Sequence, residues 1–502
     1  MLCMASRKGR PDMDIAGMDK SAGEILSSLE GKSLSVKDRM AIERQEMPSQ
    51  DPKERIRNMN EVALGYTENM ARAEALRCLD CKNKPCVEGC PVSIDIPSFI
   101  REVAKGDYKK AYDVISASSI LPAICGRVCP QEVQCQKYCT VGKALKNVDK
   151  AVSIGRLERF VADRNTDAPI PEVAPETGRK VAIVGSGPAS ISAAADIRRN
   201  GHSVVMFEAL HKTGGVLSYG IPEFRLPKKL VEKELDKLGK MGVEIRKNTL
   251  VGRTRTVHEL LGEDGFDSVF IGSGAGLPKF MGIPGENLVG VMSANEYLTR
   301  SNLMKAYDSK KSHTPEYRAK RIAVFGGGNV AMDAARTALR LGAEQVDIIY
   351  RRTQEEMPAR KEEVEHAVEE GCNILMLTQP VEILSDENGK VRAVKVRKCV
   401  LGEVGKDGRR KPVEVEGSDY EIPYDAVIVA IGNASNPLIK LTTDEIEVNQ
   451  RGNFIVDENG KTSMDKVWAG GDIVLGAATV ILAMGEGRRA AKGINEYLAS
   501  LK

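Results

Sequence analysis

Residues 180–210 read KVAIVGSGPASISAAADIRRNGHSVVMFEAL, which runs as a strand, a glycine-rich turn, a helix and a second strand. Gly185 permits the sharp turn, and Gly187 lets the backbone approach a pyrophosphate at the helix N-terminus. Ser190, at the third fingerprint position, is small enough for close packing of the helix on the strand. Glu208 ends the second strand, where a carboxylate can accept hydrogen bonds from a ribose. The stretch predicts a nucleotide-binding α/β fold.

Residues 321–360 repeat this unit as RIAVFGGGNVAMDAARTALRLGAEQVDIIYRRTQEEMPAR. Gly326 and Gly328 occupy the fingerprint positions, and Asn329 follows them at the expected start of the helix. The second strand ends in Arg351 and Arg352 instead of an acid. A guanidinium pair can make bidentate bonds to a 2′-phosphate, whereas an acid would repel it. This favours NADPH over NADH; the alternative is that the two arginines form a solvated strand end.

A third set of glycine-rich motifs accompanies the first fold. Gly215 belongs to a Gly-Gly pair shortly after Glu208, and VWAGGDIVLGAATVILAMGEGRRAA stands near the C-terminus. In that segment we expect Gly471 in a turn, Asp472 at the end of a strand and a helix from about Thr479. An acid beside a helix N-terminus suits a ribityl chain and a flavin ring edge. The set predicts FAD, and the alternative for Asp472 is a simple helix or turn cap.

Eight of the eleven cysteines fall between Cys78 and Cys139. Thiolates at two- to four-residue spacing can converge on an iron cluster, and eight would suffice for two [4Fe-4S] clusters. Structural zinc is the alternative, although only one pair has the C-x2-C spacing of a zinc knuckle. The eight form two groups: Cys78, Cys81, Cys86 and Cys90, then Cys125, Cys129, Cys135 and Cys139.

Bulk composition narrows the class of protein. The chain has 502 residues, enough for two to four domains, and its 73 basic and 70 acidic residues leave a net charge of +3. This balance gives no reason to expect nucleic acid or a membrane as partner. No apolar stretch of about 18 residues and no secretory signal is evident, so we expect a cytoplasmic protein.

The remaining segments fit around these motifs. We expect residues 1–50 to form an arm with one short helix at about 22–29, residues 59–161 to be helical, and the proline-rich residues 167–178 to be a linker. One nucleotide fold is expected to bind a flavin and the other a nicotinamide. Hydride would pass from the nicotinamide to the flavin, which can release electrons one at a time to iron–sulfur clusters. No acid–base motif stands out, so no catalytic side chain is predicted.

The motifs, taken in order, resemble the small (beta) subunit family of NADPH-dependent glutamate synthase. The resemblance covers about residues 50–502 and includes GGVLSYGIPEFRLPK (214–228) and YRRTQEEMPAR (350–360). It implies an α-helical two-cluster iron–sulfur domain followed by two Rossmann-like α/β domains, an FAD domain with an inserted NADPH domain. Together with the arm (1–50), the domains expected are the [4Fe-4S] domain (51–170), the FAD domain (175–297 and 438–502) and the NADPH domain (298–437).

The N-terminal domain is also similar to that of dihydropyrimidine dehydrogenase, in which an L-x-x-F segment supplies a non-cysteine cluster ligand. Here that segment is 157–160, so the resemblance makes Glu158 a candidate ligand. The alternative keeps Cys125 as the ligand and Glu158 as a surface acid. The implied ligand sets are Cys78, Cys81, Cys86 and Cys139 for one cluster, and Cys90, Cys129, Cys135 and Glu158 for the other.

The resemblance extends to the large subunit of the electron-bifurcating NADH-dependent ferredoxin:NADP oxidoreductase. The fold alone does not separate these activities. Since neither a glutaminase nor a glutamate-forming barrel is evident in the chain, electrons need an acceptor elsewhere. The implied partner is a glutamate synthase large chain or a ferredoxin- and NADH-binding flavoprotein; a non-catalytic scaffold subunit is the alternative of a different class.

Overall fold

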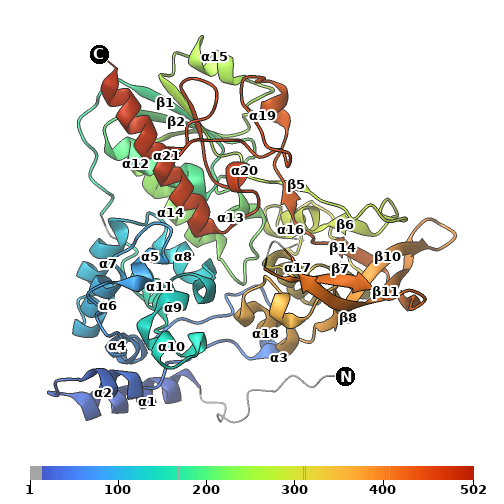
Figure 1. Ribbon diagram of the computed structural model, residues 1–502, viewed down its shortest axis with the longest axis horizontal. Helices are drawn as coiled ribbons and strands as arrows, with labels where there is room; N and C mark the ends of the chain where they lie inside the picture. Colours follow the sequence, from blue (N-terminus) through green and yellow to red (C-terminus); the bar gives the residue numbers. More distant parts are fainter. Residues whose placement is uncertain (1–13, 168, 309, 311, 406–407, 502) are drawn as a thin grey trace. The chain divides into compact units, whose positions relative to one another are not determined.

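The computed structural model describes residues 14–501 except 168, 309, 311 and 406–407. The chain forms two compact units. The first contains the described residues up to Gln50 and Val62–Pro169. The second contains Asp51–Glu61 and the chain from Ile170 onward. Figure 1 labels the helices and strands of both units.

The first unit is built from helices, as the spacing of its apolar residues predicts. In α6, for example, Ile96, Phe99, Ile100 and Val103 recur at three- and four-residue intervals and are all buried, and Gly106 ends the helix at φ +83°. The helices of this unit are α1 (Ile15–Leu29), α2 (Val36–Ala41), α4 (Glu68–Leu76), α5 (Pro85–Glu88), α6 (Ile96–Lys105), α7 (Tyr108–Ser116), α8 (Pro122–Val128), α9 (Cys135–Tyr138), α10 (Thr140–Ala144) and α11 (Ile154–Arg164).

The N-terminal segment is more ordered than its sequence suggests. Instead of one short helix at about 22–29, it contains α1 and α2, and α1 begins at Ile15 because the Asp14 side chain accepts a hydrogen bond from the Gly17 amide. Ala22 of α1 is fully buried, and α1 packs against α4. Arg39 donates to the carbonyl oxygens of Leu76 and Cys78 at 2.9 and 3.1 Å. Residues 1–13 lie outside the described part.

The second unit opens with a parallel five-stranded sheet in the order β16-β4-β1-β2-β3. Its strands are β1 (Lys180–Val184), β2 (Ser203–Phe207), β3 (Glu244–Arg246), β4 (Ser268–Ile271) and β16 (Val467–Ala469). Because β16 pairs with β4, the end of the chain returns to the sheet that begins with β1. The associated helices are α12 (Pro188–Arg199), α13 (Val216–Tyr219), α14 (Lys228–Lys240), α15 (Val257–Leu261), α19 (Leu438–Leu441), α20 (Asp472–Leu475) and α21 (Val480–Ser500), the last of which packs along α12 (Figure 1).

A second parallel sheet, in the order β6-β14-β7-β8-β9, repeats the architecture. Its strands are β6 (Val291–Ser293), β7 (Arg321–Phe325), β8 (Gln345–Tyr350), β9 (Asn373–Met376) and β14 (Ala426–Val429). Its helices are α16 (Ala294–Asn302), α17 (Asn329–Arg340) and α18 (Lys361–Glu369). We expected this fold to begin at residue 298. Strand β6 lies before that residue and nevertheless pairs with β14 of the second sheet, so the fold begins earlier than expected.

Antiparallel strands complete the second unit. Strands β10 (Thr378–Ser385), β11 (Val391–Val404), β12 (Arg410–Glu414) and β13 (Tyr420–Pro423) form a sheet. The two short strands β5 (Leu277–Pro278) and β15 (Asn433–Ala434) pair where the chain leaves the first parallel fold and where it returns. Helical and parallel α/β architecture therefore confirm the predicted fold class. No helix of the described residues has the length and apolar character needed to span a bilayer.

Candidate cofactor sites

The first group of thiols gathers side chains from both halves of the cysteine-rich segment. Burial raises the pKa of the Cys86 thiol to about 12, and the neighbouring Cys78, Cys139 and Cys81 add to the rise. Burial likewise raises the pKa of Cys78 to about 11, with further contributions from Cys139 and Cys81. The Cys81 thiol donates to the Thr140 hydroxyl at 3.2 Å. Four of the predicted ligands therefore lie together, and Cys139 comes from far along the chain.

A second group surrounds Glu158. Burial raises the pKa of Cys135 well above its usual value, and Cys90, Cys129 and Glu158 contribute next. The Glu158 side chain is on α11 and only 6% of the residue is exposed. Its Oε1 atom is buried without a hydrogen-bond partner among the described residues, and burial alone raises its pKa to about 8. The alternative that made Glu158 a surface acid is therefore wrong, and a buried carboxyl whose Oε1 atom is unpaired fits a site for a cationic iron centre.

Cys125 lies beside this second group. It is fully buried on α8 and hydrogen-bonded to the Cys129 side chain, with Glu158 and Cys90 nearby. The neighbouring Gly126 explains the close approach, because a Cβ there would come within 2.6 Å of the Arg159 amide nitrogen on α11. The structure thus brings both candidate eighth ligands to one place.

The donors are not spaced as a mononuclear metal site. Among the described residues, no group of three or more His, Cys, Asp or Glu side chains is placed to hold a single metal ion. A four-iron cluster attaches each ligand to a different iron, so its ligands need not converge on one point. The residues of both groups have the donor chemistry that [4Fe-4S] clusters use.

The first nucleotide fold has an open turn between β1 and α12. Gly185 has a φ of +92°, and a Cβ there would come within 2.6 Å of the Gly272 carbonyl oxygen. Gly187 caps α12, and a Cβ there would meet no atom of the described chain within 4 Å. Ser190 is fully buried and donates to the Gly272 carbonyl at 3.5 Å. The turn therefore leaves space at the helix N-terminus, where backbone amides attract a phosphate.

Glu208 follows β2 directly and is 5% exposed. Its carboxylate accepts hydrogen bonds from the Ser186 hydroxyl and, at 2.7 Å, from the Leu210 amide. Ser186 in turn accepts from the Gly214 amide at 2.9 Å. Next to it, Gly215 has a φ of +53° and lies against Gly187. Five predicted positions therefore adjoin one turn: Gly185, Gly187, Ser190, Glu208 and Gly215.

We expected Asp472 to end a strand, but it does not. Strand β16 stops at Ala469, and Asp472 is the first residue of the short helix α20, because Gly471 turns the chain at φ +81°. Burial raises the pKa of Asp472 to about 6. Tyr219, in the segment GGVLSYG, is a further residue of this site that no local sequence pattern marks. It lies near both Asp472 and Glu208: burial, Asp472 and then Glu208 raise its pKa to about 12.

The long C-terminal helix begins where the sequence predicts. Thr479 is the N-cap of α21, and its hydroxyl accepts from the Leu482 amide at 3.3 Å. Gly487 allows α21 to touch α12, since a Cβ there would lie 2.1 Å from the Ala189 carbonyl oxygen. This contact places α21 against α12, the helix that Gly187 caps.

The second nucleotide fold has the same open turn. Gly326 has a φ of +134°, and a Cβ there would lie 2.3 Å from the Ala430 carbonyl oxygen. Gly328 caps α17, and the nearest atom to a Cβ there would be 4.0 Å away. The Asn329 side chain accepts a hydrogen bond from the Arg360 amide at 2.9 Å, which orients it at the helix N-terminus. A second phosphate can approach here.

The two arginines after β8 differ in their surroundings. Arg352 is 9% exposed and donates through Nε to the Arg410 carbonyl oxygen on β12 at 2.7 Å. Arg351 is exposed and takes no part in a hydrogen bond or ion pair of the described residues. Arg351 therefore keeps its guanidinium available for a ligand, whereas Arg352 is partly engaged.

Two family models match the chain. Residues 55–170 match the dihydropyrimidine dehydrogenase domain II with a 4Fe-4S cluster, and residues 179–487 match pyridine nucleotide-disulphide oxidoreductase. The fold and the sites thus define a pyridine nucleotide oxidoreductase with FAD and an N-terminal [4Fe-4S] domain. NADPH is its nicotinamide substrate class, and electrons pass between nucleotide, flavin and iron–sulfur centres.

Similarity to curated proteins narrows this class. The chain is 36% identical over 466 residues to the small chain of NADPH glutamate synthase of Escherichia coli (strain K12), covering 91% of this chain and 98% of that protein. The chain belongs to this small-chain family. It is also 37% identical over 441 residues to the NADP(+)-dependent formate dehydrogenase subunit beta of Moorella thermoacetica, covering 82% of this chain and 60% of that subunit.

Among solved structures, Mycobacterium tuberculosis FprA in complex with NADPH is similar in fold. The TM-score is 0.54 at 20% sequence identity, over 65% of this chain and 85% of FprA. The likeness confirms the arrangement of nucleotide-binding folds in the second unit.

Proposed function

We propose that this chain is the electron-input subunit of a larger enzyme, passing electrons from NADPH through FAD and two [4Fe-4S] clusters to a partner subunit. The observation that carries the proposal is that the cysteine thiols and Glu158 form two groups in the first unit. The second unit of the same chain has two glycine-rich turns with space for a nucleotide. When bound, FAD takes a hydride and can release electrons one at a time. The named relatives that work as small or beta subunits support a partner.

The two thiol groups support the ligand assignment. Cys78, Cys81, Cys86 and Cys139 would hold one cluster, and Cys90, Cys129, Cys135 and Glu158 the other. Glu158 is preferred over Cys125 because its buried Oε1 atom has no hydrogen-bond partner among the described residues, while Cys125 already hydrogen-bonds to another side chain. A buried polar atom left without a hydrogen-bond partner costs about 1–3 kcal/mol, which a ligand bond would offset.

The residues of the first parallel fold would bind FAD. Gly187 and Gly215 would leave room for the pyrophosphate, Gly185 and Ser190 would shape the turn, and Glu208 would accept ribose hydrogen bonds. The remaining contacts would come from the C-terminal part of the fold, close to the ribityl chain and the ring: Gly471, Asp472 and Thr479.

The second fold would bind NADPH. Gly326 and Gly328 would admit its pyrophosphate, with Asn329 at the helix N-terminus, and Arg351 would pair with the 2′-phosphate while Arg352 supports the strand end. Hydride transfer needs two rings in register more than it needs an acid or base, so no side chain is assigned a proton-transfer step.

Reduction under anaerobic conditions tests the proposal. Iron and sulfide analysis should give about eight of each per chain, and NADPH should bleach the flavin and then produce the paramagnetic signals of reduced clusters. A colourless N-terminal unit containing zinc would contradict the cluster assignment. A flavin that NADPH cannot bleach would indicate a scaffold subunit instead.

Single substitutions separate the two candidate ligands. Glu158→Ala should remove or alter one of the two cluster signals, whereas Cys125→Ala should leave both signals unchanged. The matched control is Glu88→Ala, which replaces an exposed acid. The opposite result would assign Cys125 as the ligand.

The partner is the point on which the relatives differ. A glutamate synthase large chain fits the small-chain relative, and a ferredoxin- and NADH-binding flavoprotein fits the alternative of a bifurcating oxidoreductase. Co-purification from the native source, followed by identification of the attached subunit, decides between them.

A further inference from the structure

Residues 51–61 form a loop, here called the clasp loop, whose ends are paired with each other. The Gln50 amide donates to the Val62 carbonyl oxygen at 2.9 Å, and the Leu64 amide donates to the Pro48 carbonyl oxygen at 2.7 Å. The residues on both sides of the loop belong to the cysteine-rich unit, whereas residues 51–61 belong to the nucleotide-binding unit. The clasp loop is therefore part of the nucleotide-binding unit, although the chain on both sides of it belongs to the cysteine-rich unit.

The anchor is Arg55, the last residue of the short helix α3 (Pro52–Arg55). Asp51 caps this helix by accepting from the Lys53 amide at 2.9 Å. Arg55 is 1% exposed, and it donates through Nε to Glu370 Oε1 at 2.7 Å and through Nη2 to Glu369 Oε2 at 2.8 Å. A guanidinium so fully removed from water requires carboxylate partners, and these two carboxylates provide them.

Glu370 is shared with two other arginines. Arg336 donates to it at 2.8 and 3.0 Å, and Arg340 donates at 2.6 and 3.1 Å. Burial alone would raise the pKa of Glu370, but Arg336 and Arg340 outweigh burial and hold that pKa well below its usual range. Glu370 directly follows α18, and both of these arginines are on α17, so Arg55 joins the helix pair of the second nucleotide fold.

The same network reaches the first nucleotide fold. Arg225 donates through Nε to Glu363 at 3.1 Å, and Glu363 also pairs with Arg336. The Arg340 guanidinium lies over the Phe224 ring, with its Cζ atom 3.8 Å from the ring centroid. Phe224 and Arg225 belong to the connection between α13 and α14. A buried chain of contacts therefore runs from the clasp loop, through the second fold, to the first.

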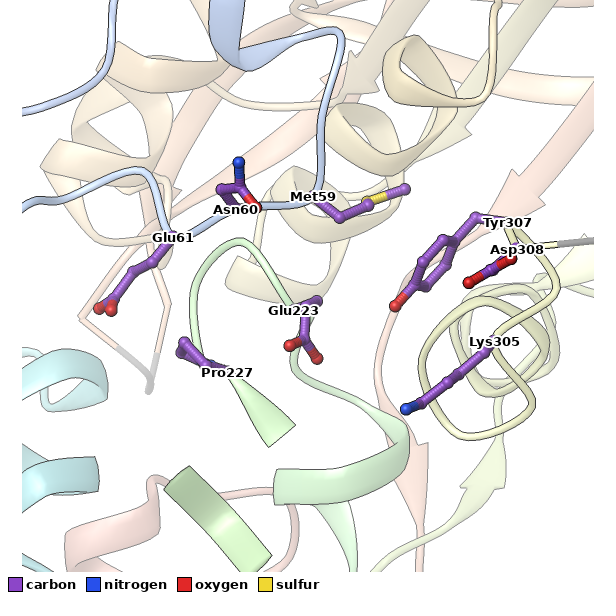
Figure 2. A pocket seen from close by; sticks show the side chains of 8 residues that line it. All are labelled: Met59, Asn60, Glu61, Glu223, Pro227, Lys305, Tyr307 and Asp308. Carbon is purple, nitrogen blue, oxygen red and sulfur yellow. The ribbon is translucent and has the colours of Figure 1, made fainter. Parts of the chain in front are cut away.

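The far end of the clasp loop faces the first fold as well. Met59, Asn60 and Glu61 line a pocket of about 410 Å³. Its other walls are Glu223 and Pro227, from the connection before α14, and Lys305, Tyr307 and Asp308 (Figure 2). Figure 2 shows the Glu223 carboxylate between the clasp loop and Tyr307. One loop therefore adjoins both nucleotide folds.

We propose that Arg55 is a positioning residue for hydride transfer, since it holds the second nucleotide fold in a fixed orientation toward the first. The inference rests on the proposed function. In the step concerned, NADPH loses a hydride and becomes NADP⁺, and the flavin gains that proton and two electrons. The reacting atoms must come within about 3.5 Å, and a misplacement of about 1 Å can cost about 100-fold in rate. The chain crosses between the folds at the short β5–β15 ribbon, which leaves orientation to side-chain contacts.

The test compares Arg55→Met with Arg57→Met in the full, flavin-loaded chain. Arg57 is on the same loop, but its side chain is 73% exposed. Its Nη1 atom is 3.9 Å from Glu54 Oε1, which is a long distance for an ion pair. In stopped-flow reduction by NADPH, Arg55→Met should lower the limiting rate at least tenfold and change the Kd for NADPH less than twofold. Arg57→Met should behave as the wild type, and Arg55→Lys should recover part of the rate. Equal limiting rates for the two methionine variants would overturn the proposal.

Two further measurements keep the proposal testable. If Arg55→Met does not accumulate as flavoprotein, Glu369→Gln removes one arm of the anchor at a residue whose side chain is 44% exposed, and an unchanged rate there overturns the proposal. Hydrogen exchange does not depend on redox activity. Residues 51–61 and 361–370 should exchange at least tenfold faster in Arg55→Met than in Arg57→Met, and equal exchange overturns the clasp. If NADPH fails to reduce the wild-type flavin, the proposed function is wrong, and the exchange result still decides whether the clasp exists.

Discussion

Arg225 donates from its Nη1 atom to both carboxylate oxygens of Asp333, at 2.7 Å each. Arg225 precedes α14 in the first nucleotide fold, and Asp333 is on α17 in the second, so this pair joins the two folds. Both side chains are at least 93% buried. Burial raises the pKa of Asp333 to about 6 even with Arg225 beside it, which shows how far this carboxyl is removed from water.

Loss of this pair should destabilise the nucleotide-binding unit. Arg225→Met leaves Asp333 and Glu363 without one of their cations, and breaking a buried pair from one side costs about 3–5 kcal/mol. Denaturant unfolding should show a loss of this size, and Arg246→Met, at a half-exposed arginine that pairs with Glu244, should change the free energy of unfolding by less than about 1 kcal/mol. Equal midpoints for the two variants would contradict the prediction.

The environments of Arg351 and Arg352 predict unequal roles in phosphate recognition. Arg351→Glu should raise KM for NADPH about 10- to 100-fold, which corresponds to the 1.5–3 kcal/mol of a charge-assisted hydrogen bond, and should leave KM for NADH within about twofold. Arg352→Glu also breaks the bond to the Arg410 carbonyl, so it should lower stability as well. Steady-state kinetics with both nucleotides checks this, with the exposed Arg392→Glu as control. Equal increases for NADPH and NADH would exclude a phosphate contact.

Local sequence patterns were sufficient for the parts of the fold that local residues determine. The turns at Gly185 and Gly326 require positive φ, so their glycines marked the strand-to-helix junctions correctly. The start of α1 was missed because one cap residue, Asp14, extends the helix. Asp472 was misplaced because a short helix directly after two glycines leaves no periodic signal.

Long-range pairing was not predictable in the same way. Arg55 and Glu370 are separated by 315 positions in sequence, and a buried ion pair of this kind leaves no mark on either segment. Glu158 emerged only from the family resemblance, since a single acid on a helix is ordinarily exposed. Its burial follows from the contact of α8 with α11 at Gly126, which only the folded chain reveals.

Gly187 and Gly328 allow a reciprocal test of the two nucleotide sites. Both have negative φ, and a Cβ at either would meet no described atom closer than 4.0 Å, so Gly187→Ala and Gly328→Ala should fold normally. Each methyl group would occupy space that a pyrophosphate needs. Gly187→Ala should lose FAD on purification, whereas Gly328→Ala should keep FAD and raise KM for NADPH at least tenfold. Each variant is the control for the other, and loss of both cofactors from either one would contradict separate sites.

His366 on α18 should make the nucleotide-binding unit sensitive to mild acid. Burial, and then the charge of Arg336, lowers its pKa from 6.5 to about 4. Between pH 4 and 6.5 the unfolded chain therefore binds a proton at this position that the folded chain does not. The free energy of unfolding must fall as the pH drops through this window, by up to about 3 kcal/mol, and the contribution is complete above pH 6.5.

Replacement of the imidazole isolates this contribution from that of the carboxylates. His366→Gln cannot bind the proton, so its free energy of unfolding should decrease by about 2–3 kcal/mol less than that of the wild type between pH 7 and pH 4. His211→Gln, at an exposed histidine, should follow the wild-type curve. Parallel curves for wild type and His366→Gln would mean that the folded chain binds this proton as readily as the unfolded chain, so that the pKa of His366 stays close to 6.5 on folding. The carboxylates of Glu363 and Glu362, which favour the charged imidazole, would then balance burial and Arg336.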